Sequence, residues 1–237
     1  MDIIWDGIKN AAVLIFTGNR EIYEILLTTI KVSGIAVLLS ILAGVPLGIA
    51  IGLNRFPARR AVVTLINTGM SAPPVAVGLI ITLFIWRSGP LGFLELLYTP
   101  AAMILAQVLI ACPIITGITL AAVQQIDPRL RQQALSLGAN RAQLLWILIK
   151  EVKYPIFTAI AAGFGRAISE VGAVLIVGGN IIGETRVLTT STIQMVRMGK
   201  FDAAISLVAI LLALSFGVNF VIILIQQKER ITWIPKF

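Results

Sequence analysis

Arg166 and Glu170 are the two charged residues in an otherwise apolar run from residue 156 to residue 177. Residues four apart on a helix share a face, so these two side chains can form an ion pair. At 1.5 Å per residue, Arg166 lies about 15 Å along a helix that starts near residue 156, close to the middle of a bilayer. A charge at that depth is costly, so both side chains should face protein or a water-filled path. They are either a structural pair that holds this helix against its neighbours or a pathway element that offers positive charge to an anion.

Uncharged hydrogen-bond donors gather in the polar stretch that follows, from residue 178 to residue 192. Amide and hydroxyl groups, together with backbone N–H groups, can hold an anion without a full positive charge. The alternative is a capped loop or a re-entrant turn that binds nothing. From this part of the chain we take Arg166, Ser169, Glu170, Asn180, Thr189 and Thr190 as candidate pathway residues.

An earlier apolar run, residues 61–86, has 26 residues without a charge, yet Gly69-Met70-Ser71-Ala72-Pro73-Pro74 interrupts its centre. Two consecutive prolines prevent a regular helix throughout. Broken backbone at membrane depth is tolerated only where it faces protein or a water-filled cavity. The interruption is therefore a packed kink or a break that lines a pathway, and the second interpretation adds Ser71, Pro73 and Pro74 to the candidate pathway residues.

The composition indicates a membrane protein. Of the 237 residues, 58% are hydrophobic and 13% are charged, and the mean hydropathy is +0.96. Soluble domains carry about 25% charged residues. The net charge of +8 comes from dispersed lysines and arginines, which points to membrane topology rather than to nucleic acid binding. With one cysteine and no histidine, the chain has neither a disulfide framework nor a cysteine-based metal site, and we expect no metal site.

Long uncharged runs predict an all-α integral membrane protein with five transmembrane helices. The expected spans are residues 22–53, 61–86, 97–123, 155–178 and 203–226, within one transmembrane domain of residues 21–227. Residues 1–20 form an amphipathic segment that lies along the membrane or spans it as a short helix. Residues 228–237 form a tail. In the first span, Gly44, Gly48 and Gly52 recur every four residues, which lets a neighbouring helix approach closely.

The lysines and arginines predict the orientation, because positive charge favours the cytoplasmic face. Residues 54–60 carry three of them, residues 129–153 carry five and the tail carries three, which makes eleven on one side. The other side has six. The N-terminus is therefore expected outside and the C-terminus in the cytoplasm.

A polar island, residues 127–155, separates the third span from the fourth. Asp127 is a suitable N-cap and Pro128 suits the first position of a helix. Gly138 suits a helix C-cap, and Asn140 is a second N-cap. The island is thus predicted to be a helix over residues 128–137, a turn at Gly138 and a second helix from residue 141.

The first helix of the island carries an apolar face formed by Leu130, Ala134 and Leu137, which predicts a short docking surface. It docks either on a soluble partner or on the membrane surface.

A helix–Gly–helix island between the third and fourth of five spans resembles the permease subunits of type I ABC importers. The motif of that family reads Glu-Ala-Ala, three residues, Gly, nine residues and Ile-x-Leu-Pro. With its Gly on Gly138, the other parts fall on Gln132-Gln133-Ala134 and Leu148-Ile149-Lys150-Glu151, where both glutamines and the Lys-Glu pair depart from the pattern. In that family the first helix inserts into a groove on the ATP-hydrolysing subunit. The resemblance implies a coupling set of Arg129, Leu130, Arg131, Gln133, Ala134, Leu137, Gly138, Ala139, Asn140 and Arg141.

Four further stretches are similar to permeases for oxyanions, tungstate first, with molybdate and sulfate as relatives. They are Gly44-Val45-Pro46-Leu47-Gly48, Ser88-Gly89-Pro90-Leu91-Gly92, the run from Gly163 to Ala173, and the run from Gly178 through Thr190. The resemblance implies a homodimer in a bacterial or archaeal cytoplasmic membrane, working with two ATPase subunits and an external oxyanion-binding protein.

The chain has no Gly-x-x-x-x-Gly-Lys-Ser/Thr phosphate loop, so ATP and Mg²⁺ are expected on the partner ATPase, with no cofactor and no enzymatic activity in this chain. The rival from another class is a membrane scaffold whose island recruits a different cytoplasmic protein. A membrane enzyme comes third, because catalytic side chains are scarce in the spans.

Overall fold

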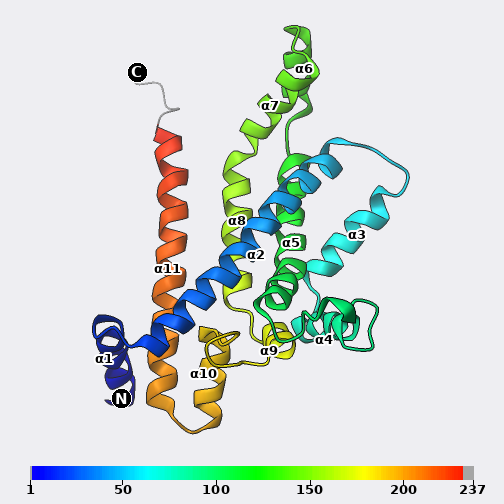
Figure 1. Cartoon of the computed structure of the whole chain (residues 1–237). Helices are drawn as coiled ribbons and strands as arrows, with labels where there is room; N and C mark the ends of the chain where they lie inside the picture. The colour runs from blue at the N-terminus through cyan, green and yellow to red at the C-terminus, as the bar shows by residue number, and fades with distance from the viewer. Residues whose placement is uncertain (1, 232–237) are drawn as a thin grey trace.

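The computed structural model describes residues 2–231, and all regular structure in this range is helical (Figure 1). Residues 232–237 of the predicted tail lie outside the described residues, whereas residues 228–231 continue the last helix. In chain order the elements are α1 (Asp2–Phe16), α2 (Arg20–Leu53), α3 (Arg59–Met70), α4 (Pro74–Ile85), the 3-10 turn η1 (Gly92–Leu94), α5 (Pro100–Gln124), α6 (Pro128–Ser136), α7 (Arg141–Glu151), α8 (Lys153–Ile168), α9 (Gly172–Gly178), α10 (Leu188–Arg197) and α11 (Phe201–Ile231).

The centre of the bundle is α5, which packs along α2 and against α3 and α8. The glycine stripe of α2 forms the contact with α5, as predicted. A Cβ atom on Gly48 would lie 2.8 Å from the carbonyl oxygen of Thr116, and one on Gly44 would lie 3.1 Å from a side-chain atom of Ile115. Because a side chain at Gly48 would overlap the backbone of α5, the glycine lets α2 and α5 approach each other closely.

Three helices are long and apolar enough to cross a membrane: α2, α5 and residues 201–227 of α11. Two bent pairs add up to two further spans: α3 with α4, at an angle of 104°, and α8 with α9, at 54°. The prolines at residues 73 and 74 predicted the first bend. Within the expected span over residues 155–178, the helix is interrupted, because α8 ends at Ile168 and α9 begins at Gly172.

The two ends of the molecule differ in character (Figure 1). At one end α4, α9, α10 and the start of α11 gather; at the other, α6 and α7 protrude beyond the bundle. The first residues of α1 and the last residues of α11 lie at opposite ends. Helix α1 packs on α11, where the hydroxyl of Ser206 donates to the carbonyl of Gly7 at 2.8 Å. With 15 residues, α1 is shorter than the roughly 20 residues that a span needs.

Candidate functional site

The protruding segment, residues 127–151, is built by local hydrogen bonds. The carboxylate of Asp127 accepts from the backbone N–H of Arg129 at 2.8 Å and so caps α6. After α6, Gly138 has a φ of +81°, the left-handed region that glycine adopts without strain. The N–H of Ala139 then donates to the carbonyl of Ala134 at 3.0 Å. The predicted helix–Gly–helix geometry is present, with α6 ending at Ser136, one residue before its predicted end.

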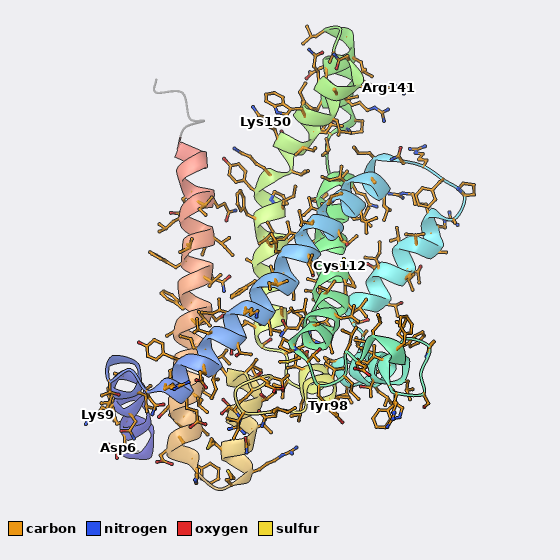
Figure 2. The ribbon with its side chains drawn as sticks, viewed as in Figure 1. Asp6, Lys9, Tyr98, Cys112, Arg141 and Lys150 are labelled. Atoms are coloured by element: carbon orange, nitrogen blue, oxygen red, sulfur yellow. The ribbon has the colours of Figure 1, made fainter. Side chains whose placement is uncertain are left out.

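The second helix of the protruding segment is fixed by a capping box. The N–H of Gln143 donates to the side chain of Asn140 at 2.9 Å, and the N–H of Asn140 donates to the side chain of Gln143 at the same distance. Further along α7, the ammonium of Lys150 lies 3.5 Å from the centre of the Trp146 ring. Figure 2 shows Arg141 and Lys150 on this segment, at the opposite end of the molecule from Tyr98. The segment therefore presents a pre-organised polar surface beyond the bundle.

The exposed apolar side chains of the protruding segment differ from the predicted docking face. Ala134 is 6% exposed and Leu130 is half-buried, so these two side chains turn toward the protein. Leu137 is 88% exposed and Leu135 is 50% exposed. The other members of the coupling set are exposed apart from the half-buried Ala139: Arg129, Arg131, Gln133, Gly138, Asn140 and Arg141. A partner protein would thus meet Leu135 and Leu137 surrounded by arginines and amides.

The breaks in the two bent helix pairs face each other, although about 100 residues of sequence separate them. A Cβ atom on Gly78 would lie 2.7 Å from Cα of Ala173, and one on Gly172 would lie 2.8 Å from Cγ2 of Val75. The first turns of α4 and α9 are therefore in direct contact. We call residues 71–75 and 166–173 the break junction.

Glu170 is 3% exposed and contacts the end of α8, the start of α9 and the start of α10. Its Oε1 accepts from the N–H of Ala173 at 3.0 Å, which caps α9, and its backbone carbonyl accepts from the hydroxyl of Thr189 at 3.0 Å. Its other oxygen, Oε2, lies 3.9 Å from Nη2 of Arg166, a long ion pair. The sequence had predicted that Glu170 and Arg166 share the face of one helix. In the structure Glu170 instead follows the end of α8. The side chain of Arg166 is 35% exposed, so its charge is only partly neutralised.

The remaining junction residues form local bonds. The hydroxyl of Ser71 donates to the carbonyl of Thr68 at 3.2 Å, and that of Ser169 donates to the carbonyl of Gly165 at 2.8 Å. Both serines are exposed. Pro73 precedes α4 as its N-cap residue and Pro74 is its first residue. The prolines therefore explain why α3 cannot continue directly into α4.

Three predicted pathway residues lie outside the break junction: Asn180, Thr190 and Thr189, whose bond to Glu170 is described above. Asn180 has a φ of +55° and its amide donates to the side chain of Gln194 at 2.8 Å, while its Oδ1 is buried without a partner in the described structure. Thr190 is 1% exposed, and its hydroxyl both donates to the carbonyl and accepts from the N–H of Val187. The threonine hydroxyls predicted as ligand donors thus satisfy the backbone around α10.

The sequence did not predict two contacts in this region. The hydroxyl of Thr29 in α2 accepts from the N–H of Leu188 at 3.0 Å, which caps α10 from another helix. Arg186, 7% exposed, lies 3.5 Å from the carboxylate of Glu21 at the start of α2. These partners are 159 and 165 residues apart, so no local pattern could have paired them.

Residues 44–231 match the model of the family described as binding-protein-dependent transport system inner membrane component. The chain belongs to this family. The match extends from the glycine stripe of α2 through the protruding segment and the break junction to the end of α11. The chain is thus a multi-pass inner membrane component of a transport system, in agreement with its apolar helices.

Curated members of the family are similar over most of the chain. The tungstate uptake system permease protein TupB of Peptoclostridium acidaminophilum is 39% identical over 228 residues, which are 96% of this chain and all of the relative. A probable anion ABC transporter permease protein of Haloferax volcanii is 45% identical over 81% of this chain and 84% of its own length. TupB of Campylobacter jejuni is 33% identical over 93% of this chain and 92% of its own length.

Among solved structures, a bacterial ABC transporter that imports the acidic polysaccharide alginate has the same fold. Its matching chain superposes with a TM-score of 0.71 at 17% sequence identity, covering 92% of this chain and 83% of that one. The expected all-α permease fold is therefore confirmed.

Proposed function

We propose that this chain is the permease subunit of an ATP-driven importer for a tetrahedral oxyanion, and that the anion is tungstate. The identity of 39% to a tungstate permease along the whole length of that relative carries the proposal. A second tungstate permease is 33% identical, whereas the sulfate permeases are between 24% and 29% identical over shorter parts of the chain. Molybdate and sulfate are therefore the alternatives that an experiment must separate from tungstate.

The proposed assembly is a homodimer with two cytoplasmic ATPase subunits and an external binding protein. The family description, a binding-protein-dependent system, supports the external partner. The apolar part of α11 is only 6% buried, so its surface is available to lipid or to a second permease subunit. The protruding segment is proposed to enter the ATPase groove, where ATP and Mg²⁺ would be bound. With the protruding segment in the cytoplasm, the N-terminus lies outside and the C-terminus lies in the cytoplasm.

The order of helices suggests how ATP hydrolysis would act on the pathway. Only Val152, 3% exposed, separates α7 from α8, so a displacement of α6 and α7 passes into α8. Helix α8 ends at the break junction, where Glu170 and Arg166 lie. Closure of the ATPase subunits would thus reposition the junction relative to α4 and open the path outward, and nucleotide release would reverse the movement.

Arg166 is the residue of the break junction that can attract an anion, since its charge is partly exposed. Arg166→Ala is expected to lower uptake about tenfold, the size of one lost charge-assisted contact, with the assembled complex unchanged in yield. Arg197→Ala, at an exposed position in the last turn of α10, is the matched control. Normal uptake by a normally assembled Arg166→Ala complex would remove Arg166 from the pathway.

The test of the function uses the whole complex in lipid vesicles. ATP hydrolysis is measured while the cognate binding protein is added in its tungstate-, molybdate- or sulfate-loaded form. We expect tungstate-loaded protein to stimulate hydrolysis most strongly. Equal stimulation by all three forms, or by none, would contradict the assignment to tungstate, and a permease that does not copurify with an ATPase would favour the scaffold.

A further inference from the structure

A basic pocket of about 350 Å³ opens at the same end of the molecule as the protruding segment. It lies between the turn from α2 to α3, the end of α5 and the start of α6. Its polar lining consists of Asn54, Arg55, Arg59, Gln124, Asp127 and Arg131. Its volume falls within the roughly 300–1,000 Å³ of pockets that bind small molecules. With three guanidinium groups and one carboxylate, its lining carries a net positive charge.

The guanidinium groups of the basic pocket are largely free to bind an anion. Arg55 and Arg131 are exposed, and neither forms a hydrogen bond or an ion pair within residues 2–231. Arg59 uses its Nε to donate to the carbonyl of Ile51 at 3.1 Å. The carboxylate of Asp127 already accepts from the N–H of Arg129. Planar guanidinium groups from three segments match the oxygens of a phosphate group well.

Aliphatic side chains adjoin the basic pocket along the bundle. They are Ile49, Leu53, Val123, Ile126, Leu148, Ile149 and Val152, and the space between them is too narrow to admit a water molecule. Four of these residues, Leu53, Val123, Ile126 and Leu148, also line the basic pocket. Cationic groups therefore lie beside a closed hydrocarbon surface. A free inorganic anion would contact only the cationic groups, whereas an amphiphile would contact both.

We propose that the basic pocket binds the phosphate headgroup of an anionic phospholipid, with one acyl chain lying over the adjoining aliphatic surface. The pocket lies where two candidate membrane spans end, α2 at Leu53 and α5 at Gln124. Headgroups lie at this level of a bilayer, and basic pockets between spanning helices on the cytoplasmic side attract anionic lipids. The proposal goes beyond the transport function, since it does not depend on which anion is carried.

The bound lipid would connect the protruding segment to the bundle. Pro128 and Arg131 belong to α6, Leu148 belongs to α7, and Arg55 and Arg59 belong to the turn before and the start of α3. A phosphate between these arginines cancels their mutual repulsion and fixes the angle at which α6 leaves the membrane. Anionic lipid is therefore expected to stabilise the form of the segment that is proposed to meet the ATPase.

The test labels the whole complex, permease with its ATPase subunits, in nanodiscs. Phosphatidylglycerol or phosphatidylcholine carries a photoreactive diazirine near the start of one acyl chain, and labelled peptides are mapped by mass spectrometry. We expect phosphatidylglycerol to label the peptide that contains residues 49–53, and Arg55→Gln to reduce this labelling about tenfold, as for the loss of one charge-assisted contact. Arg60→Gln, at the second residue of α3 and outside the pocket lining, should change it less than about twofold.

A second variant tests the aliphatic surface separately from the charge. Ile49→Gln places a polar group on this surface at a half-buried position and should reduce labelling while Arg55 is intact. Millimolar inorganic phosphate, tungstate and chain-free glycerophosphoglycerol are added as competitors, and each is expected to compete weakly. Equal labelling by phosphatidylcholine, equal labelling in the Arg55→Gln and Arg60→Gln complexes, or full competition by a free anion would overturn the proposal. Absence of labelling in the complex would overturn it as well. Labelling needs no transport, so its result is independent of the uptake experiments.

Discussion

The protruding segment and the break junction both interrupt apolar sequence, but they are stabilised in opposite ways. In the protruding segment every capping bond joins residues no more than five apart, such as Asn140 with Gln143. At the junction the decisive contacts are long-range, such as Glu170 with Thr189 and α4 against α9. The first region can keep its shape while it moves as a unit, whereas the second exists only while several helices hold one another. This is the division expected between an element that a partner moves and the region where that movement acts.

The largest expected effect comes from closing the contact between α4 and α9. Gly78→Leu puts Cβ 2.7 Å from backbone Cα of Ala173, which cannot move aside, and should lower the free energy of unfolding by about 3 kcal/mol. Thermal unfolding of the purified complex in detergent measures the loss. Gly34→Leu is the matched control, because no atom lies within 4 Å of a Cβ there. Equal loss in both variants would mean that replacing any helix glycine destabilises the protein, whether or not α4 contacts α9 at that position.

Removal of the cap on α9 should have the next largest effect. Glu170→Ala deletes the acceptor for the N–H of Ala173 and leaves Arg166 without its partner, which should cost about 2 kcal/mol in the free energy of unfolding. Glu170→Gln keeps an acceptor oxygen and should recover more than half of that loss. If the glutamine variant is as unstable as the alanine variant, the ion pair matters more than the cap. Thermal unfolding again provides the measurement.

In the protruding segment, Gly138→Val tests the turn. A β-branched residue at a φ of +81° is strained by about 1–2 kcal/mol, and the turn that directs α7 back to the bundle should open. ATP hydrolysis by the complex should continue while oxyanion uptake per ATP falls. Gly18→Val, at a φ of +69° with open space around it, applies the same strain in the turn between α1 and α2. Intact coupling in the Gly138→Val complex would show that this helix has a different partner.

The smallest effect on stability is expected at the exposed tip. Leu137 is 88% exposed, so Leu137→Ser should change the free energy of unfolding by less than about 0.5 kcal/mol. If the ATPase groove buries this side chain, the same variant should bind the ATPase subunit about tenfold more weakly. The affinity of the purified permease for the purified ATPase subunit is the measurement. Phe93→Ser is the control, because Phe93 is 77% exposed near the other end of the molecule. Unchanged ATPase affinity would exclude Leu137 from the groove.

The local signals of the sequence predicted one region well and the other only in part. Asp127, Gly138 and Asn140 each act on backbone groups within a few residues, so their types and spacing were sufficient to predict the protruding segment. Pro73 and Pro74 likewise predicted the break between α3 and α4. Burial was harder to predict: Leu130, Ala134 and Leu137 share a helical spacing, but the return of α7 covers only part of that face.

The break between α8 and α9 was not predicted, for a physical reason. No proline marks residues 168–172, and a continuous helix there is compatible with the local sequence. The break is stabilised because Glu170 caps α9 and receives the hydroxyl of Thr189, a residue 19 positions later. The sequence left open whether the hydroxyl groups of Thr189 and Thr190 bind a ligand or cap a loop, and in the fold they bond to Glu170 and Val187. Prediction from one sequence fails where a side chain's partner is chosen by tertiary packing.

The cap that Thr29 provides for α10 has a consequence for biosynthesis. Its hydroxyl donates to Ile25 within α2 and accepts from the N–H of Leu188, so the acceptor is complete as soon as α2 has formed. The ribosome makes α2 before α10, so the acceptor for the N–H of Leu188 is synthesised before the donor. A truncated chain that ends after α8 leaves Thr29 satisfied by its own helix. The N–H of Leu188 therefore finds a partner as soon as α10 packs against α2.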